Sequence, residues 1–191
     1  MLDRREFVAR LLKDRGELMV LTGLGTATFD VAAQGDHPLN FYIWSGMGCT
    51  AIVGLGLALA RPDRRVAVIT GDGDVLMALG SLATIGSKQP KNLTIVCIDN
   101  AVYAATGMQP TATGAGCDLA ATARSCGFKQ VVAPVKIDEV AGVRTLLHEG
   151  QGPAFVHARV GTQKHERVIP TRDGYGMKHR FLEASGKPAM F

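Results

Sequence analysis

Hydrophobic positions near the start of the chain recur at helical spacing among charged residues. In "REFVARLLKDRGE", the side chains of Phe7, Val8, Leu11 and Leu12 fall on one face of a 3.6-residue period. This pattern predicts an amphipathic helix, and Gly16 is suited to end it.

Later parts of the chain carry short continuous apolar runs rich in β-branched residues, which are typical of strands buried on both faces. Helical stretches separate most of these runs, and a Gly- and Thr-rich loop is expected over 22–28. This alternation predicts an α/β fold, a parallel β-sheet with helices on both faces. The predicted strands are 18–21, 66–70, 92–100, 129–135 and 153–160, with a strand or turn at the start of "NFYIWSGMGC"; the predicted helices are 50–60, one that begins near Asp74, 117–126, and 137–150.

Length and composition favour one domain over residues 1–191, because 191 residues with 47% hydrophobic and 20% charged side chains can bury a single sizeable core. Beyond Gly161 the periodic pattern fades, and we expect a basic C-terminal tail from about 162 with a short helix around 177–184. The chain has no apolar leader and no run of about 18 apolar residues, which predicts a cytoplasmic protein without a membrane span. Its four cysteines form no CxxC pair, so neither a disulfide framework nor a thiolate metal site is indicated.

The net charge of +4 and the pI near 9.0 raise the question of an anionic partner. Acidic residues are interspersed with basic ones and only 6% of residues are aromatic, so nucleic-acid binding ranks behind the binding of small anions or an acidic protein. The charges from Lys164 to Arg180 form, by default, a solvated face.

Polar residues with metal-binding chemistry follow two of the predicted strands. Gly71-Asp72-Gly73 comes directly after "VAVIT", and Asp99 and Asn100 end the next strand, "NLTIVCIDN". In parallel sheets the carboxyl ends of the strands form one edge, and ligands bind beyond it. Mg²⁺ prefers carboxylate, amide and carbonyl oxygens. Asp72, Asn100 and one backbone carbonyl would supply such a set.

Each of these features also has a purely structural interpretation. A lone GDG is a common turn, and Asp74 is suited to cap the helix that follows. "GLGTAT" lacks the third glycine of a dinucleotide fingerprint, and there is no GxxxxGK[ST] phosphate loop. His37, His148 and His157 are scattered and are interpreted as structural or surface residues rather than ligands.

The order of strand, "GDGD", helix, strand and "DNAVY" resembles the thiamine diphosphate-dependent enzymes, whose diphosphate-binding domain carries a GDG motif and then an Asn-Asn or Asp-Asn pair at a similar distance. Within that family, "NFYIWSGMGC", "GDGDVLMALGSLATIG", "KNLTIVCIDNAVYAATGMQPTAT" and the terminal "RFLEA" resemble the short, separate beta-type subunits of sulfopyruvate and phosphonopyruvate decarboxylases. The resemblance covers about residues 18–185 and implies a thiamine diphosphate-binding fold of the PP (diphosphate-binding) type.

The resemblance implies roles for individual residues. Mg²⁺ would be bound by the side chains of Asp72 and Asn100 and by the carbonyl of Val102. Met47 would wedge between the two rings of the cofactor, and the Ser45 carbonyl would accept a hydrogen bond from the pyrimidine amino group. Further cofactor-binding residues would be Gly71, Gly73 and Asp74 through their backbone, Gly25 and Thr26 in the earlier loop, and Gly48 and Tyr103.

Two departures from the family pattern concern these motifs. This chain has Ser45-Gly46 where the family often has Gly-Ser, and it has Asp74 where a small neutral residue is usual. Because a carboxylate beside a diphosphate would repel it, Asp74 is expected to point away, cap its helix or pair with a base. Met47 also has a structural alternative, since methionine readily fills gaps in a core.

The family's cofactor-activating glutamate belongs to a pyrimidine-binding domain, and the chain is too short to hold both domains. The resemblance therefore implies a pyrimidine-binding, alpha-type partner subunit and an active site between unlike chains, with a hetero-oligomer, or a homo-oligomer when this chain is isolated. The reaction would release carbon dioxide and an aldehyde from a small anionic 2-oxo acid. Thr106, Gln109 and Thr111 are candidate substrate contacts, or structural loop residues, and Lys164, Arg167 and Arg172 are candidates for the anionic group.

Other functions remain open at this stage. A carboligase of the acetolactate synthase kind or a 2-oxo acid:ferredoxin oxidoreductase would use the same cofactor site, although the cysteine pattern disfavours an iron–sulfur cluster in this chain. A non-catalytic assembly or binding module is a further alternative, which the intact Asp72 and Asn100 disfavour.

Overall fold

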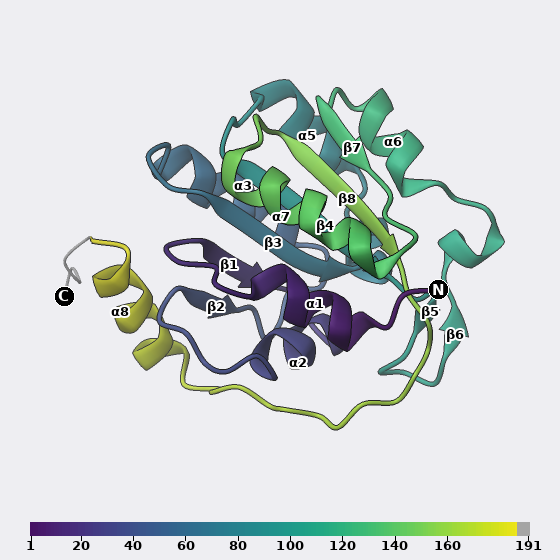
Figure 1. The fold of residues 1–191 in the computed structure, drawn as a ribbon, viewed down its shortest axis with the longest axis horizontal. Coiled ribbons are helices and arrows are strands. Elements are labelled where there is room, and N and C mark those ends of the chain that lie inside the picture. Colours follow the sequence, from purple (N-terminus) through teal and green to yellow (C-terminus); the bar gives the residue numbers. More distant parts are fainter. Residues whose placement is uncertain (187–191) are drawn as a thin grey trace.

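Six parallel strands form the central sheet, in the order β2-β1-β3-β4-β8-β7 (Figure 1). The structure is a computed structural model, and residues 1–186 are described. The expected parallel sheet is confirmed, and its order places the two strands with the acidic motifs, β3 and β4, side by side at its centre. The strands of the sheet are β1 (Met19–Thr22), β2 (Asn40–Tyr42), β3 (Val66–Gly71), β4 (Leu93–Asp99), β7 (Gln130–Val132) and β8 (Ala154–Arg159).

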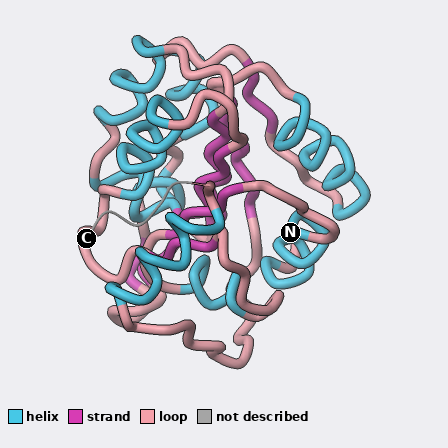
Figure 2. Tube along the Cα trace, turned by 90° about the vertical axis from the view of Figure 1, so that its left-hand side faces the viewer, coloured by secondary structure: helices cyan, strands magenta, loops and turns pink. Residues whose placement is uncertain are grey.

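Helices cover both faces of this sheet, as the sequence pattern predicts. Figure 2 shows the strands as a central layer with helices on either side. One face packs against α1, α2 and α7, and the other against α3, α5 and α6. The helices are α1 (Arg4–Leu12), α2 (Thr26–Ala32), α3 (Thr50–Ala60), α4 (Asp72–Met77), α5 (Gly80–Lys88), α6 (Leu119–Ser125), α7 (Val140–Glu149) and α8 (Gly174–Ala184), with short 3₁₀ turns η1 (Ala112–Ala115) and η2 (Ile137–Glu139).

The continuous apolar strands supply both halves of the core. Along β3, Ala67 and Ile69 contact the first helix layer, while Val66 and Val68 contact the second. Successive side chains of a strand point to opposite faces, so a strand covered on both sides needs apolar residues at every position. This requirement explains the unbroken run "VAVIT".

Several local features differ from the expectations. The loop expected over 22–28 is shorter, because α2 already begins at Thr26. The helix expected from near Asp74 begins at Asp72 and is divided into α4 and α5. A two-stranded antiparallel hairpin, β5 (Val102–Tyr103) with β6 (Gln109–Pro110), follows β4 and was not predicted, since its strands are only two residues long.

The C-terminal segment crosses the surface of the domain before it ends in α8 (Figure 1). Arg5 Nη2 donates to the carbonyl of Glu166 at 2.8 Å, and Trp44 Nε1 donates to that of Thr171 at 2.8 Å. The predicted helix is confirmed and is longer than expected, and the ring of Phe181 packs edge-on against Phe41 at 5.6 Å. The expected extent of the domain, 1–191, includes residues 187–191, which lie outside the described part. Within the described part, no helix has both the length and the apolar character that crossing a membrane requires.

Candidate active site

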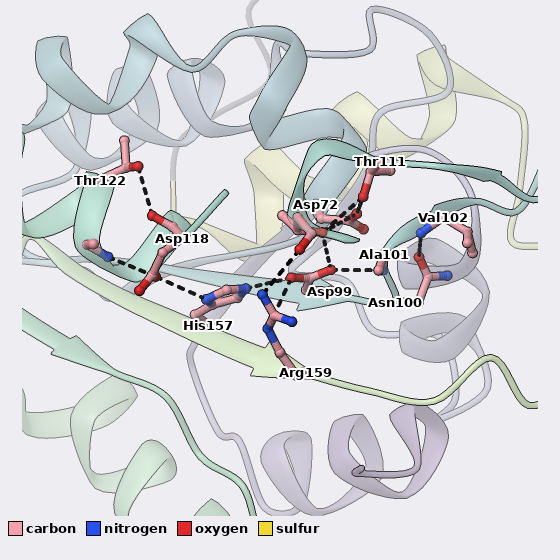
Figure 3. Close-up of polar contacts among 12 residues, drawn as sticks. Asp72, Asp99, Asn100, Ala101, Val102, Thr111, Asp118, Thr122, His157 and Arg159 are labelled. Carbon is pink, nitrogen blue, oxygen red and sulfur yellow. Dashed lines mark hydrogen bonds and ion pairs between the residues drawn. The ribbon is translucent and has the colours of Figure 1, made fainter. Parts of the chain in front are cut away.

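The loops that follow β3 and β4 meet at one edge of the sheet. Gly71, the last residue of β3, pairs with Ile98 of β4, so Asp72 and Asn100 leave the sheet beside each other. Asp72 and Asn100 therefore lie at the same edge of the sheet, as the sequence predicts. Figure 3 shows these residues together with the segment that returns from the β5–β6 hairpin.

Asp72 is a buried carboxylate held by two threonine hydroxyls. It is 2% exposed, and its Oδ2 accepts a hydrogen bond from Thr111 Oγ1 at 2.5 Å, with Thr113 Oγ1 at 3.3 Å. Burial, and then the negative charge of Asp99, raise the pKa of Asp72 above its ordinary value. The carboxylate is therefore under-compensated by its protein partners.

The small cluster around Asp72 has more oxygen acceptors than hydrogens. Thr111 uses its one hydroxyl hydrogen toward Asp72, and Thr113 uses its own toward Asp99 Oδ1 at 2.8 Å. The 2.9 Å contact between the two hydroxyl oxygens is then left without a hydrogen. This excess of lone pairs and negative charge suits a cation better than an anion.

Asn100 and Val102 form a tight turn directly after β4. The Val102 amide donates to Asn100 Oδ1 at 3.1 Å, and the Ala104 amide donates to the Val102 carbonyl at 3.1 Å. Ala101 between them adopts a left-handed conformation, with φ +59, which is uncommon for a non-glycine residue. Each oxygen accepts one of these hydrogen bonds and has a second lone pair that a metal ion could use.

No group of three or more His, Cys, Asp or Glu side chains among residues 1–186 is arranged to hold a metal ion. The expected ligand set does not require one, because it combines one carboxylate with an amide oxygen and a backbone carbonyl. Such mixed oxygen sets are usual for Mg²⁺, which keeps its other positions for water and phosphate.

Met47, Gly73 and Tyr103 come together although they lie far apart in the sequence. A Cβ atom on Gly73 would stand 2.5 Å from Tyr103 Cε1 and 3.2 Å from Met47 Cε. Only glycine fits at this position. The structure therefore brings three of the expected cofactor-binding residues onto one small surface.

The turn that carries Met47 depends on the two glycines around it. Gly46 and Gly48 have φ values of +75 and +91. Side chains rarely adopt such values, so the order Ser45-Gly46 is required by this backbone. Ser45 itself is exposed.

Asp74 is buried and points into the protein. Its Oδ1 accepts from the Gly48 amide at 2.6 Å and its Oδ2 from Thr70 Oγ1 at 2.5 Å. Among the described residues it thus neither caps its helix nor pairs with a base, two of the possibilities raised by the sequence. Asp74 instead ties the Met47 turn to the end of β3.

The loop after β1 approaches the same edge. Gly25 has φ +78 and precedes Thr26, the first residue of α2. A Cβ on nearby Gly23 would lie 2.7 Å from Thr50 Oγ1 and 3.3 Å from Asp74 Oδ2. Gly25 and Thr26 therefore lie at the edge of the sheet where they are expected to approach the diphosphate.

The candidate substrate contacts fall into two environments. Thr106 and Gln109 are exposed and hydrogen-bonded to each other, with Thr106 Oγ1 2.8 Å from Gln109 Oε1. Thr111 is 3% exposed and is occupied with Asp72. The structure thus gives Thr111 a partner inside the protein that the sequence did not indicate.

The cluster around Asp72 also contains Asp99, Thr113 and His157, which were not predicted as site residues. Asp99 Oδ2 accepts from His157 Nε2 at 2.7 Å, and Asp99 Oδ1 accepts from Thr113. Burial acts to raise the pKa of Asp99, but the hydrogen bonds from His157, Thr113 and the Ala101 amide outweigh it and lower the pKa. His157 was interpreted as structural or at the surface. It is 4% exposed, and no sequence spacing linked it to Asp99, since 58 positions separate them.

Comparison with known proteins decides the family. The family described as "Thiamine pyrophosphate enzyme, C-terminal TPP binding domain" matches residues 23–158. This chain belongs to that family. It is 39% identical over 184 residues to sulfopyruvate decarboxylase subunit beta of Methanocaldococcus jannaschii, covering 95% of this chain and 96% of that subunit. The expected resemblance and fold are confirmed.

A longer relative and a solved structure extend the comparison. Phosphonopyruvate decarboxylase of Streptomyces viridochromogenes is 39% identical over 141 residues, which are 74% of this chain but 35% of that protein, so the chain spans about a third of that relative. A 2-oxoglutarate:ferredoxin oxidoreductase from Magnetococcus marinus has the same fold, with a TM-score of 0.65 at 20% identity over 96% of this chain and 75% of that one. The domain described above is therefore a thiamine pyrophosphate-binding domain.

Proposed function

We propose that this chain is the diphosphate- and Mg²⁺-binding, beta-type subunit of a two-subunit thiamine diphosphate-dependent decarboxylase. The substrate would be an anionic 2-oxo acid of the sulfopyruvate or phosphonopyruvate kind, and the products carbon dioxide and an aldehyde. The observation that carries the proposal is the buried, under-compensated carboxylate of Asp72 beside the Asn100 turn, in a chain of the thiamine pyrophosphate enzyme family.

Three oxygen atoms would hold the metal ion: a carboxylate oxygen of Asp72, Oδ1 of Asn100 and the carbonyl of Val102. The acceptor-rich contacts around Asp72 support this role, because a divalent cation would relieve the repulsion between Asp72 and Asp99. Thr111 orients the Asp72 carboxylate through its 2.5 Å hydrogen bond.

The backbone around Gly73 and the Met47 turn would shape the cofactor site. When bound, thiamine diphosphate supplies the carbon nucleophile and accepts the electrons released with carbon dioxide. Gly71 and Gly73 would meet the diphosphate through their backbone, and Gly25 and Thr26 would approach it from the loop after β1. Met47, fixed between two glycines, would set the shape of the cofactor, with the Ser45 carbonyl as its neighbour.

The acid that activates the cofactor would come from an alpha-type partner. Several glutamates of this chain already have other partners: Glu6 pairs with Arg10, Glu17 pairs with Arg64, and Glu139 accepts from the Lys136 amide. None of these three partners belongs to the cluster around Asp72. We therefore assign proton transfer on the cofactor to a second subunit and metal and diphosphate binding to this one.

A basic side chain lies close to the Met47 turn and supports an anionic substrate. The guanidinium of Arg172 stands 5.2 Å above the ring of Trp44, which precedes Ser45. Stacking on an aromatic face holds a guanidinium in place while its N–H groups stay available for an anion. Arg172 is therefore our preferred candidate for the sulfonate or phosphonate group among the three basic residues of the tail.

The first test is calorimetric titration of the full chain with thiamine diphosphate and Mg²⁺, alone and mixed with any alpha-type subunit encoded beside it. We expect binding that requires Mg²⁺, is tighter in the mixture and is lost in Asp72→Ala. Thr106→Val, at an exposed loop position, serves as the matched control and should bind normally. Absence of binding by the wild-type mixture would refute the proposed function.

Product analysis of the assembled subunits then separates the reactions. Release of an aldehyde from sulfopyruvate or phosphonopyruvate supports a decarboxylase. A ligated hydroxy-keto acid would instead identify a carboligase, and product formation that depends on an electron acceptor would identify an oxidoreductase. Cofactor binding without turnover beside the genuine partner would identify a non-catalytic module.

A further inference from the structure

A buried histidine on β8 lies next to the candidate metal site without belonging to it. His157 is 4% exposed, and its backbone pairs with Cys97 of β4, two residues before Asp99. Residues two apart on a strand share a face, so the imidazole and the Asp99 carboxylate meet, with Nε2 2.7 Å from Oδ2 (Figure 3). Because an ionised carboxylate only accepts, Nε2 has to carry the hydrogen of this bond.

The other oxygen of Asp99 serves both halves of the site. Asp99 Oδ1 accepts from the Ala101 amide at 2.9 Å and from Thr113 Oγ1 at 2.8 Å. The first bond fixes the left-handed Ala101, around which Asn100 and Val102 turn. The second bond fixes Thr113.

Thr113 extends the chain of contacts to Asp72. Its hydroxyl lies 2.9 Å from that of Thr111 and 3.3 Å from Asp72 Oδ2. Thr113 is 1% exposed, so no solvent competes for these bonds. Hydrogen bonds thus lead from His157 through Asp99 to the Ala101 turn and to Thr113, and Thr113 in turn lies in contact with Thr111 and Asp72.

We propose that His157 is a positioning residue: by orienting the Asp99 carboxylate, it holds the Asn100–Val102 turn and, through Thr113, Asp72 in the geometry that binds Mg²⁺ with a diphosphate. This inference rests on the proposed function. Partners that orient metal ligands typically change metal affinity by about 10–100-fold when they are removed.

The test measures metal affinity directly, without relying on turnover. Mn²⁺ replaces Mg²⁺, and the free ion is titrated by electron paramagnetic resonance on the full chain assembled with its alpha-type subunit, in the presence of thiamine diphosphate. His157→Leu removes the donor at similar size, whereas His157→Gln restores an N–H at about the position of Nε2. His148→Leu, on α7, is the matched control that removes a partly buried histidine elsewhere.

We expect Mn²⁺ affinity to fall about 10–100-fold in His157→Leu, to recover most of the way in His157→Gln, and to stay unchanged in His148→Leu. The KM for Mg²⁺ should rise in His157→Leu while kcat at saturating Mg²⁺ stays near that of the wild type. Should His157→Leu fail to fold, Thr113→Val and its conservative counterpart Thr113→Ser test the same series of contacts, with loss in the first and recovery in the second.

Two failures are distinguishable. Wild-type affinity for Mn²⁺ in a folded His157→Leu variant, or in Thr113→Val where His157→Leu does not fold, would overturn this inference alone and would leave the metal site standing. A wild-type assembly that binds no Mn²⁺ with thiamine diphosphate would overturn the inference together with the proposed function.

Discussion

Thr111 offers a measurable consequence of the buried Asp72 carboxylate. Thr111→Val keeps the size of the side chain, which is 3% exposed, and removes the hydroxyl that donates to Asp72 Oδ2 at 2.5 Å. Because the rest of the packing is preserved, the change in free energy of unfolding reports on this one hydrogen bond.

The expected magnitude follows from the charge and burial of the acceptor. A hydrogen bond to a charged group contributes about 1.5–3 kcal/mol. Thr113 Oγ1 is already 3.3 Å from Asp72 Oδ2 and can recover part of the loss. We therefore expect the free energy of unfolding to decrease by about 1.5 kcal/mol. For a chain of this size that corresponds to a Tm lowered by roughly 3–6 °C.

The effect should also depend on pH in a stated direction. Burial and then the charge of Asp99 raise the pKa of Asp72 above its ordinary value. The contribution of Asp72 to the free energy of unfolding therefore falls as the pH rises from the ordinary pKa through the raised pKa. The Thr111 hydrogen bond favours the ionised form and acts to lower this pKa. Removing it therefore costs most where Asp72 is ionised, at neutral pH, and costs less toward acid pH, where Asp72 is protonated.

Urea denaturation of the full chain without cofactor, at neutral and at acid pH, measures both effects. Thr106→Val is the control, since its hydroxyl is exposed, and should change the free energy of unfolding by less than about 0.5 kcal/mol. A loss in Thr111→Val no larger than that of the control, or one that grows as pH falls, would refute the reasoning about Asp72.

Other predictions concern packing, ion pairs and the metal. Gly73→Ala should lower stability by about 1–3 kcal/mol and weaken thiamine diphosphate binding, because its Cβ would stand 2.5 Å from the Tyr103 ring, whereas Gly80→Ala, with open space around it, should not; denaturation and calorimetry measure the two effects. Asp30→Asn should lower the free energy of unfolding by about 3–5 kcal/mol in urea denaturation, since it leaves the buried Arg4 without its ion pair, while Asp36→Asn at the more exposed pair with Arg180 should cost less than about 1 kcal/mol. At a thiamine diphosphate concentration 100-fold above its Kd, cofactor binding should stabilise the folded chain by up to about 2.7 kcal/mol, and chelation of divalent cations should remove this stabilisation. In a thermal-shift assay, Asp72→Ala should show no such loss on chelation.

The strands and the edge that carries the site were predictable, because their signals are local. An unbroken β-branched run such as "VAVIT" suits only a strand covered on both faces, and a parallel sheet brings the ends of neighbouring strands to one edge. Asp72 and Asn100 therefore lie beside each other as expected. The β5–β6 hairpin and helix α2 were missed, since two-residue strands and a seven-residue helix leave too short a pattern.

The sequence by itself determined the fold class, the family and the residues that reach the edge of the sheet, because periodicity and motif spacing are properties of short segments. Only the tertiary structure decided what those residues touch. Asp74 bonds Gly48 across 26 positions, Thr111 bonds Asp72 across 39, and His157 bonds Asp99 across 58. Such contacts depend on strand order, on register and on which face each side chain takes; a one-residue shift of β8 against β4, for example, would turn His157 away from Asp99.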